Sequence, residues 1–190
     1  IRVRRRRRVL LGNAELSLRG ATVNNAIELV VRSTLIGAGA TLTMDAWAAF
    51  LRRFGIPSLN FALLGRWIGH LLEGRFVHES IAKAAPVRGE LLIGWSAHYA
   101  IGITFATVLL LVFGLDWARS PSIGPALLIG IVTVVAPLFV LQPALGAGIA
   151  SWKTATPLFN SVKSVATHTV FGVGLFLAAR LTAWLLPGGN

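Results

Sequence analysis

Four long apolar runs dominate the pattern of hydrophobic and polar positions along the chain. They occupy residues 29–50, 91–115, 123–145 and 165–186. Each run can form a helix that crosses a hydrocarbon core of about 30 Å, which takes about 20 residues. The runs lack the alternation with period two that is typical of a β-barrel strand. The pattern therefore predicts an all-α, polytopic membrane protein with four transmembrane helices.

A shorter, amphipathic stretch lies between the first and second runs, at residues 58–76. Leu59, Leu63, Trp67 and Leu71 recur every four residues, and the polar side chains fall mostly elsewhere on the helical wheel. This pattern favours a helix that lies in the membrane interface over a re-entrant or spanning segment. The candidate functional residues of this interfacial loop are Asn60, Arg66, Trp67, His70 and His78.

The third run contains two prolines near its end, Pro137 and Pro143. Proline lacks the backbone N–H and clashes with the preceding turn, so a helix that contains it bends or breaks. We therefore expect the third helix to be kinked or broken late. A short turn, "DWARSPS", joins the second and third helices, and the connection "ASWKTATPLFNSVKS" leads to the fourth.

Short matching motifs suggest an internal repeat. The second and fourth runs contain "HYAIG" at residues 98–102 and "HTVFG" at residues 168–172, and the first and third runs both contain "LIG". The four helices can thus be two copied pairs with parallel topology, with the amphipathic loop inserted in the first copy. Chance similarity between apolar sequences is the alternative explanation.

Composition agrees with a membrane protein, because 55% of the residues are hydrophobic and 13% are charged. The formal net charge is +11. Much of it lies in an arginine run at residues 2–8, which can be a phosphate-binding arm, part of a targeting signal, or sequence foreign to the mature chain. We expect residues 1–22 to be a disordered or non-native basic extension and residues 23–190 to form a single four-helix transmembrane domain. We expect no nucleic-acid partner.

Membrane orientation depends on the same arginine run. If the run is discounted, most Lys and Arg residues lie in the loops after the first and third helices, which should then be cytoplasmic. If the run is retained, the two sides carry nearly equal positive charge. The sequence therefore leaves the orientation open.

Several polar side chains fall inside the predicted spans, at the same end of the bundle. The ends of helices one and three and the starts of helices two and four meet on one side of a four-helix topology. The polar residues near these ends are Asp45, His98, Tyr99, Gln142 and His168. We therefore expect them to form an intramembrane cluster that binds a ligand or relays a proton.

Simpler roles compete with this hypothesis. Asp45 can snorkel to the interface, pair with Arg52 or Arg53, or cap a helix, and both histidines can do no more than hydrogen-bond between helices. A metal site that recruits His70 or His78 is a further alternative, but no single helix shows a metal-ligand spacing. Glu28 and Arg32 have the spacing of an ordinary ion pair on a helix.

Enzyme signatures are missing from the sequence. It contains no phosphate-binding lysine loop, no GxSxG elbow and no dinucleotide-binding glycine pattern followed by an acidic residue. It also contains no cysteine, which excludes disulfides, thiolate metal ligands and cysteine nucleophiles. We therefore predict no catalytic residues, no metal and no cofactor.

The motifs taken together resemble a known family. "GATLTMDAWAAFLRRFGIPSLNFALLGRWIGH", "GRFVHESIAKAAPVRGELLIGWSAHYAIGITFA", "LQPALGAGIA" and "THTVFGVGLFLAA" are similar to an uncharacterised bacterial integral-membrane family, domain of unknown function 2938, over about residues 26–186. The resemblance implies a multi-pass protein of the bacterial inner (plasma) membrane. It implies no activity, substrate or catalytic residue.

Two functions follow as expectations, and a membrane-embedded enzyme is a third. In the first, the polar cluster, covered by the amphipathic loop, binds or passes a small ligand, a lipid headgroup or a proton. In the second, the protein is a structural or assembly subunit of a larger membrane complex, with its glycine-rich helix faces as contact surfaces. The expected partners are the lipid bilayer and either a second copy of the chain or a larger complex.

Overall fold

The structure is a computed structural model, which describes the backbone of residues 2–187 and the side chains of residues 22–187. The described residues form helices and no strand, as the sequence predicts. The helices are α1 (Arg2–Arg52), α2 (Phe61–Leu71), α3 (Glu90–Arg119), α4 (Ile123–Val132), α5 (Gln142–Leu145) and α6 (Pro157–Leu185), with short helical segments η1 (Ile81–Lys83), η2 (Ala136–Leu141) and η3 (Ile149–Ser151). The predicted basic extension lies almost wholly outside the described side chains, and its proposed foreign origin stays a prediction.

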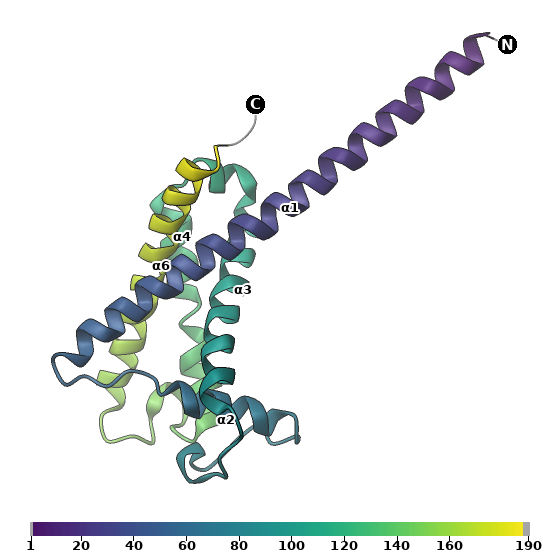
Figure 1. Ribbon diagram of the computed structural model, residues 1–190. Coiled ribbons are helices and arrows are strands. Elements are labelled where there is room, and N and C mark those ends of the chain that lie inside the picture. The colour runs from purple at the N-terminus through teal and green to yellow at the C-terminus, as the bar shows by residue number, and fades with distance from the viewer. Residues whose placement is uncertain (1, 188–190) are drawn as a thin grey trace.

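Four helical segments of the described chain are long and apolar enough to cross a membrane: Thr22–Arg52, Glu90–Arg119, Ile123–Leu145 and Pro157–Leu185. They pack side by side, with α1 lying obliquely across α3 and α6 (Figure 1). The buried core between them consists of small and branched side chains such as Ile36, Ala40, Leu109 and Leu175. The predicted four-helix transmembrane fold is therefore confirmed.

Glycines allow the helices of each predicted repeat to touch. A Cβ added at Gly37 of α1 would collide with the backbone of α3 at Gly102 and Ile103. A Cβ added at Gly130 of α4 would lie 2.5 Å from the Cα of Gly172 in α6. In both pairs, α1 with α3 and α4 with α6, the glycine of the "LIG" motif therefore contacts the helix at the glycine of the motif that begins with histidine. This correspondence supports the internal repeat.

The third span is broken, as its prolines predict. Regular α-helix ends at Val132, and a π-helical segment, η2, carries Pro137 before α5 begins at Gln142. A π-helix has a wider turn than an α-helix and often occurs at a functional site. The break separates α4, which packs against α6, from η2, which faces the space between the helices.

The amphipathic loop forms a short helix against the start of α3. α2 begins three residues later than the sequence predicts, because the side chain of Asn60 accepts a hydrogen bond from Ala62 N (3.0 Å) and caps the helix. Cβ atoms at Gly65 and Gly94 would collide with backbone carbonyls across this contact. At 11 residues, α2 spans about 16 Å and is too short to cross a membrane. Its position in an interface stays a prediction.

The loop between α2 and α3 is held by Arg66. Its guanidinium pairs with Glu90 at 2.8 Å and also donates to backbone carbonyls of η1 and its neighbours, including Ile81 O and Ala84 O. The hydrogen bond to Glu90 raises the pKa of Arg66, so this cation stays charged. Arg66 is thereby a structural organiser of the loop.

A second polar cluster closes the opposite end of the bundle. The buried guanidinium of Arg32 pairs with Glu28 (2.8 Å) and donates to Leu186 O (2.6 Å) and Ala118 O (3.4 Å). Glu28 also binds Arg119. The terminal carbonyls of a helix lack intrahelical donors and carry partial negative charge, so a cation stabilises them. The predicted Glu28–Arg32 pair is present and ties α1 to the ends of α3 and α6.

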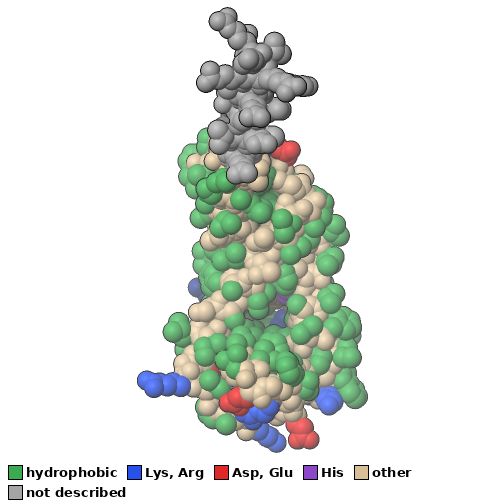
Figure 2. All heavy atoms as spheres, turned by 90° about the vertical axis from the view of Figure 1, so that its right-hand side faces the viewer, with side chains coloured by type: hydrophobic (Ala, Val, Ile, Leu, Met, Phe, Trp, Pro, Cys, Tyr) green, Lys and Arg blue, Asp and Glu red, His purple; other side chains and the backbone are tan. Residues whose placement is uncertain are grey.

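The outer surface is largely apolar. Large exposed hydrophobic side chains occur on every spanning helix, including Leu42, Leu111, Val132 and Leu181. Figure 2 shows hydrophobic side chains over most of one face, with charged side chains gathered at its lower end. The same face has a hollow, in which a histidine and a basic side chain are visible. Such a surface is typical of contact with lipid.

Candidate functional site: a cavity between the spanning helices

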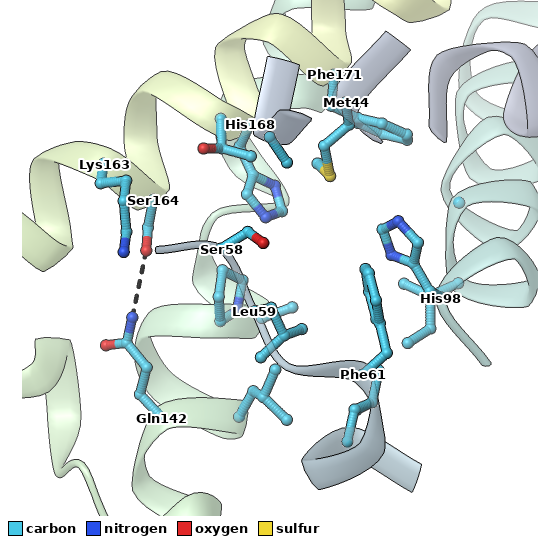
Figure 3. Close-up of a pocket in the computed structure, with 18 of the residues that line it drawn as sticks. Met44, Ser58, Leu59, Phe61, His98, Gln142, Lys163, Ser164, His168 and Phe171 are labelled. Atoms are coloured by element: carbon cyan, nitrogen blue, oxygen red, sulfur yellow. Dashed lines mark hydrogen bonds between the residues drawn. The ribbon is translucent and has the colours of Figure 1, made fainter. Parts of the chain in front are cut away.

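A cavity of about 470 Å³ lies between α1, α3, η2 and α6, at the end of the bundle nearest α2. Most of its wall is apolar, and its larger side chains include Met44, Leu51, Leu59, Phe61, Ile101, Phe105, Val140 and Phe171. Figure 3 shows His98 and His168 on opposite sides of the open space. The polar groups that line the cavity include four of the five predicted cluster residues, Asp45, His98, Gln142 and His168.

Asp45 is held by two side chains of α3. Its carboxylate lies 3.0 Å from His98 Nε2 and accepts a hydrogen bond from the Tyr99 hydroxyl, also at 3.0 Å. Asp45 thus pairs with a histidine and a tyrosine, and neither Arg52 nor Arg53 is its partner. Tyr99 reaches the cluster through this bond and does not itself line the cavity.

The tautomer of His98 follows from these contacts. An ionised carboxylate only accepts hydrogen bonds, so His98 Nε2 carries the hydrogen. In the neutral ring Nδ1 is then an acceptor, and it has no partner among the described residues. The side chain of Phe61 covers the ring, with centroids 4.6 Å apart. His98 therefore offers one free acceptor in an apolar setting.

His168 is contacted by Thr133, which directly follows α4. The Thr133 hydroxyl donates its single hydrogen to Gly130 O at 2.7 Å, and its oxygen lies 3.0 Å from His168 Nδ1. The same hydroxyl can donate to Nδ1 instead, so Nε2, which has no partner among residues 22–187, carries a hydrogen in one tautomer and a lone pair in the other. His98 and His168 precede the crossing glycines Gly102 and Gly172 by four residues each. The two repeats thus present equivalent histidines to one cavity.

Gln142 and Ser164 form the polar wall next to the start of α6. Gln142 Nε2 donates to Ser164 Oγ at 3.2 Å, as Figure 3 shows, and Ser164 in turn donates to Asn160 O. The oxygen of the Gln142 amide is buried without a partner in the structure. Gln142 is therefore only partly satisfied by the protein itself.

The end of the cavity nearest α2 is crossed by an extended segment, residues 56–60, which we call the strap. Ser58 and Leu59 of the strap lie along the open space in Figure 3. Lys163 of α6 donates from Nζ to Pro57 O (2.9 Å), and Arg52 donates to Ser58 Oγ (3.1 Å). Two cations therefore contact the strap.

The predicted residues of the interfacial loop mostly lie elsewhere. Trp67 is the exception, because it lines the cavity and donates to Phe76 O at 2.9 Å. Asn60 and Arg66 have the structural contacts described above. His70 Nδ1 and His78 Nε2 lie 2.8 Å apart, away from the cavity, so neither joins His98 and His168. In the described residues no group of three or more His, Asp or Glu side chains is placed to hold a metal ion.

Sequence reasoning missed several polar residues of this site. Thr133 lies in an apolar run, and Ser58 was expected inside a helix that in fact begins at Phe61. Lys163 and Ser164 precede the run predicted for the fourth helix, whereas α6 begins at Pro157, a favoured first residue of helices. The sequence signal for Lys163 and Ser164 was the polar face of residues 157–164, which a hydropathy profile does not show.

Comparison with known proteins identifies the family. A family model described as a protein of unknown function (DUF2938) matches residues 34–182. No curated protein matches the chain. No solved structure matches it either. The family match includes most of the chain, at least part of each of the four spanning segments and every polar residue of the cavity, so the chain belongs to the DUF2938 family.

Proposed function

We propose that this protein, in the bacterial inner membrane, binds a small molecule that is mostly apolar and carries a hydrogen-bond donor. The cavity is the observation that supports this function: two histidines from equivalent positions line an otherwise apolar space. Apolar pockets with a few convergent polar groups are the usual form of ligand sites. Asp45 and Tyr99 orient His98, Thr133 orients His168, and His98, Gln142 and His168 receive the ligand.

The polar groups argue against a purely structural role for the cavity. A polar atom buried without a partner costs roughly 1–3 kcal/mol. The Gln142 oxygen is buried and needs a donor that the described residues do not supply, and one ring nitrogen of each cavity histidine has no protein partner among them. A bound hydroxyl or amine provides such a donor, and an apolar body fills the space beside Met44 and Phe105.

Blocking the cavity tests this function. Ala48 lines the cavity, whereas the next residue of α1, Ala49, is exposed and does not line it. We expect native mass spectrometry of protein extracted gently from its host membrane to show a discrete bound small molecule or lipid. Ala48→Trp should remove this molecule, because the indole occupies the space, and Ala49→Trp should retain it. Equal binding by both variants would place the molecule outside the cavity.

Asp45→Asn tests the polar cluster without changing its shape. The amide oxygen still accepts from Tyr99, so we expect normal abundance and folding. The substitution removes the charge that holds His98 in one tautomer. The affinity for the bound molecule should therefore fall by at least about tenfold, which corresponds to one charge-assisted hydrogen bond. Asp116→Asn is the control, because Asp116 is exposed at the opposite end of α3. Unchanged ligand retention in Asp45→Asn would remove the cluster from the proposal.

The assembly-subunit hypothesis uses the glycine-rich helix faces as contact surfaces. The glycine faces expected to contact a partner are occupied inside the chain, as Gly37, Gly102, Gly130 and Gly172 show. A partner would have to bind another surface. Co-purification in mild detergent distinguishes the two hypotheses, since a reproducible protein partner without any bound small molecule would favour assembly.

A further inference from the structure

The charge balance at the strap identifies the chemistry of the ligand more closely. Lys163 and Arg52 approach the strap from α6 and α1 and contact neighbouring residues, Pro57 and Ser58. No carboxylate among residues 22–187 lies within ion-pair distance of either cation. The nearby acidic group of the cavity, Asp45, is instead bound by His98 and Tyr99. Lys163 thus brings unmatched positive charge to one end of the cavity, and Arg52 adds an exposed cation at the strap outside it.

Both cations have unused donors. The ammonium of Lys163 has three N–H groups, and its only hydrogen bond is to Pro57 O. The guanidinium of Arg52 has five, and it donates only to Ser58 Oγ. Lys163 is half-buried beside the ring of Phe159, where a cation without a counter-ion is costly. An anion at the strap would satisfy both groups, and guanidinium in particular matches carboxylate and phosphate oxygens.

The rest of the cavity fits hydrocarbon. Beyond the strap the wall is built from side chains such as Met44, Ile101, Phe105 and Phe171. The apolar face of the molecule also has a hollow with a basic side chain inside it (Figure 2). A charged group at one end and an apolar body beyond it are the two parts of an amphiphile.

We propose that the ligand is an anionic amphiphile whose phosphate or carboxylate binds Lys163 and Arg52 and whose hydrocarbon chain lies in the cavity. This inference rests on the proposed function, since it names the class of molecule that the cavity binds.

The test compares lipids that share their chains and differ in charge. Purified full-length protein in detergent is titrated with phosphatidylglycerol, phosphatidylcholine and a free fatty acid, and binding is followed by native mass spectrometry and thermal shift. We expect phosphatidylglycerol or the fatty acid to bind at least about tenfold more tightly than phosphatidylcholine. Preference for phosphatidylglycerol alone identifies an anionic phosphodiester headgroup, and preference for the fatty acid alone identifies carboxylate.

Matched variants assign that preference to the strap. Lys163→Gln should abolish most of it, and Lys163→Arg should restore it, which excludes a simple folding defect. Lys153→Gln is the control, because Lys153 is exposed and lies beside the Trp152 ring outside the cavity. Equal binding of charged and neutral lipids, or a preference that survives Lys163→Gln, overturns the inference while leaving the proposed function intact. Failure of all three lipids to bind overturns the inference alone, whereas binding that Ala48→Trp does not reduce overturns both.

Discussion

Gly130→Ala is expected to destabilise the bundle severely although it adds a single methyl group. The new Cβ would lie 2.5 Å from Gly172 Cα, 2.7 Å from Gly172 N and 2.8 Å from His168 O. All three are backbone atoms, which cannot rotate away, so α4 and α6 must separate. Overpacking of this kind costs about 1–3 kcal/mol even where side chains can adjust. We expect a loss at or above the upper end of that range, measured as a lower Tm in detergent.

The same helix provides the control. A Cβ at Gly124 meets nothing within 4 Å, so Gly124→Ala should keep or slightly raise the Tm, as alanine is the better helix former. The equivalent crossing of the first repeat makes a second comparison, because Gly37→Ala should resemble Gly130→Ala. Similar Tm values for Gly124→Ala and Gly130→Ala would show that the helices are not in backbone contact.

Arg32→Met is the second substitution with a large expected effect. The buried guanidinium bonds Glu28 and the terminal carbonyls Leu186 O and Ala118 O, and methionine replaces none of these donors. Breaking a buried ion pair typically costs 3–5 kcal/mol. Since Glu28 keeps Arg119 as a partner, we expect about 3 kcal/mol, seen as a lower Tm and as earlier proteolysis at the end of α6.

Two further variants separate the causes of this loss. Arg32→Lys keeps the charge but cannot reach three acceptors with one ammonium, so only part of the stability should return. Arg180→Met removes an exposed arginine of α6 and should change the free energy of unfolding by less than about 0.5 kcal/mol. Wild-type stability in Arg32→Met would show that these hydrogen bonds make no net contribution.

The spans and the gathering of polar residues could be predicted because each depends on one-dimensional information. A run of about 20 apolar residues identifies a spanning helix without knowledge of its neighbours. Alternating helix direction then places Asp45, His98, Gln142 and His168 at one end, and all four line the cavity. The glycines at the helix crossings could also be predicted from the sequence, because close packing requires small residues in the matching motifs.

The partners of these residues could not be predicted, because they depend on how each helix is rotated about its axis. Tyr99 directly follows His98 in α3, and adjacent residues of a helix do not share a face. Both side chains nevertheless reach Asp45. Thr133 lies beside His168 only because the helices cross at Gly130. Lys163 and the strap meet across 106 positions of sequence. Contacts of this kind are fixed by packing and leave no periodic signal.

The hollow on the apolar face affects how binding to this protein must be measured. An amphiphile that enters there comes from the bilayer and not from water, so its effective concentration is its mole fraction among the lipids. Diluting the aqueous phase then leaves occupancy unchanged, whereas diluting the ligand with other lipids lowers it. Occupancy in a cell would accordingly report the composition of the surrounding membrane, and a change in lipid synthesis would reach the site without any soluble messenger.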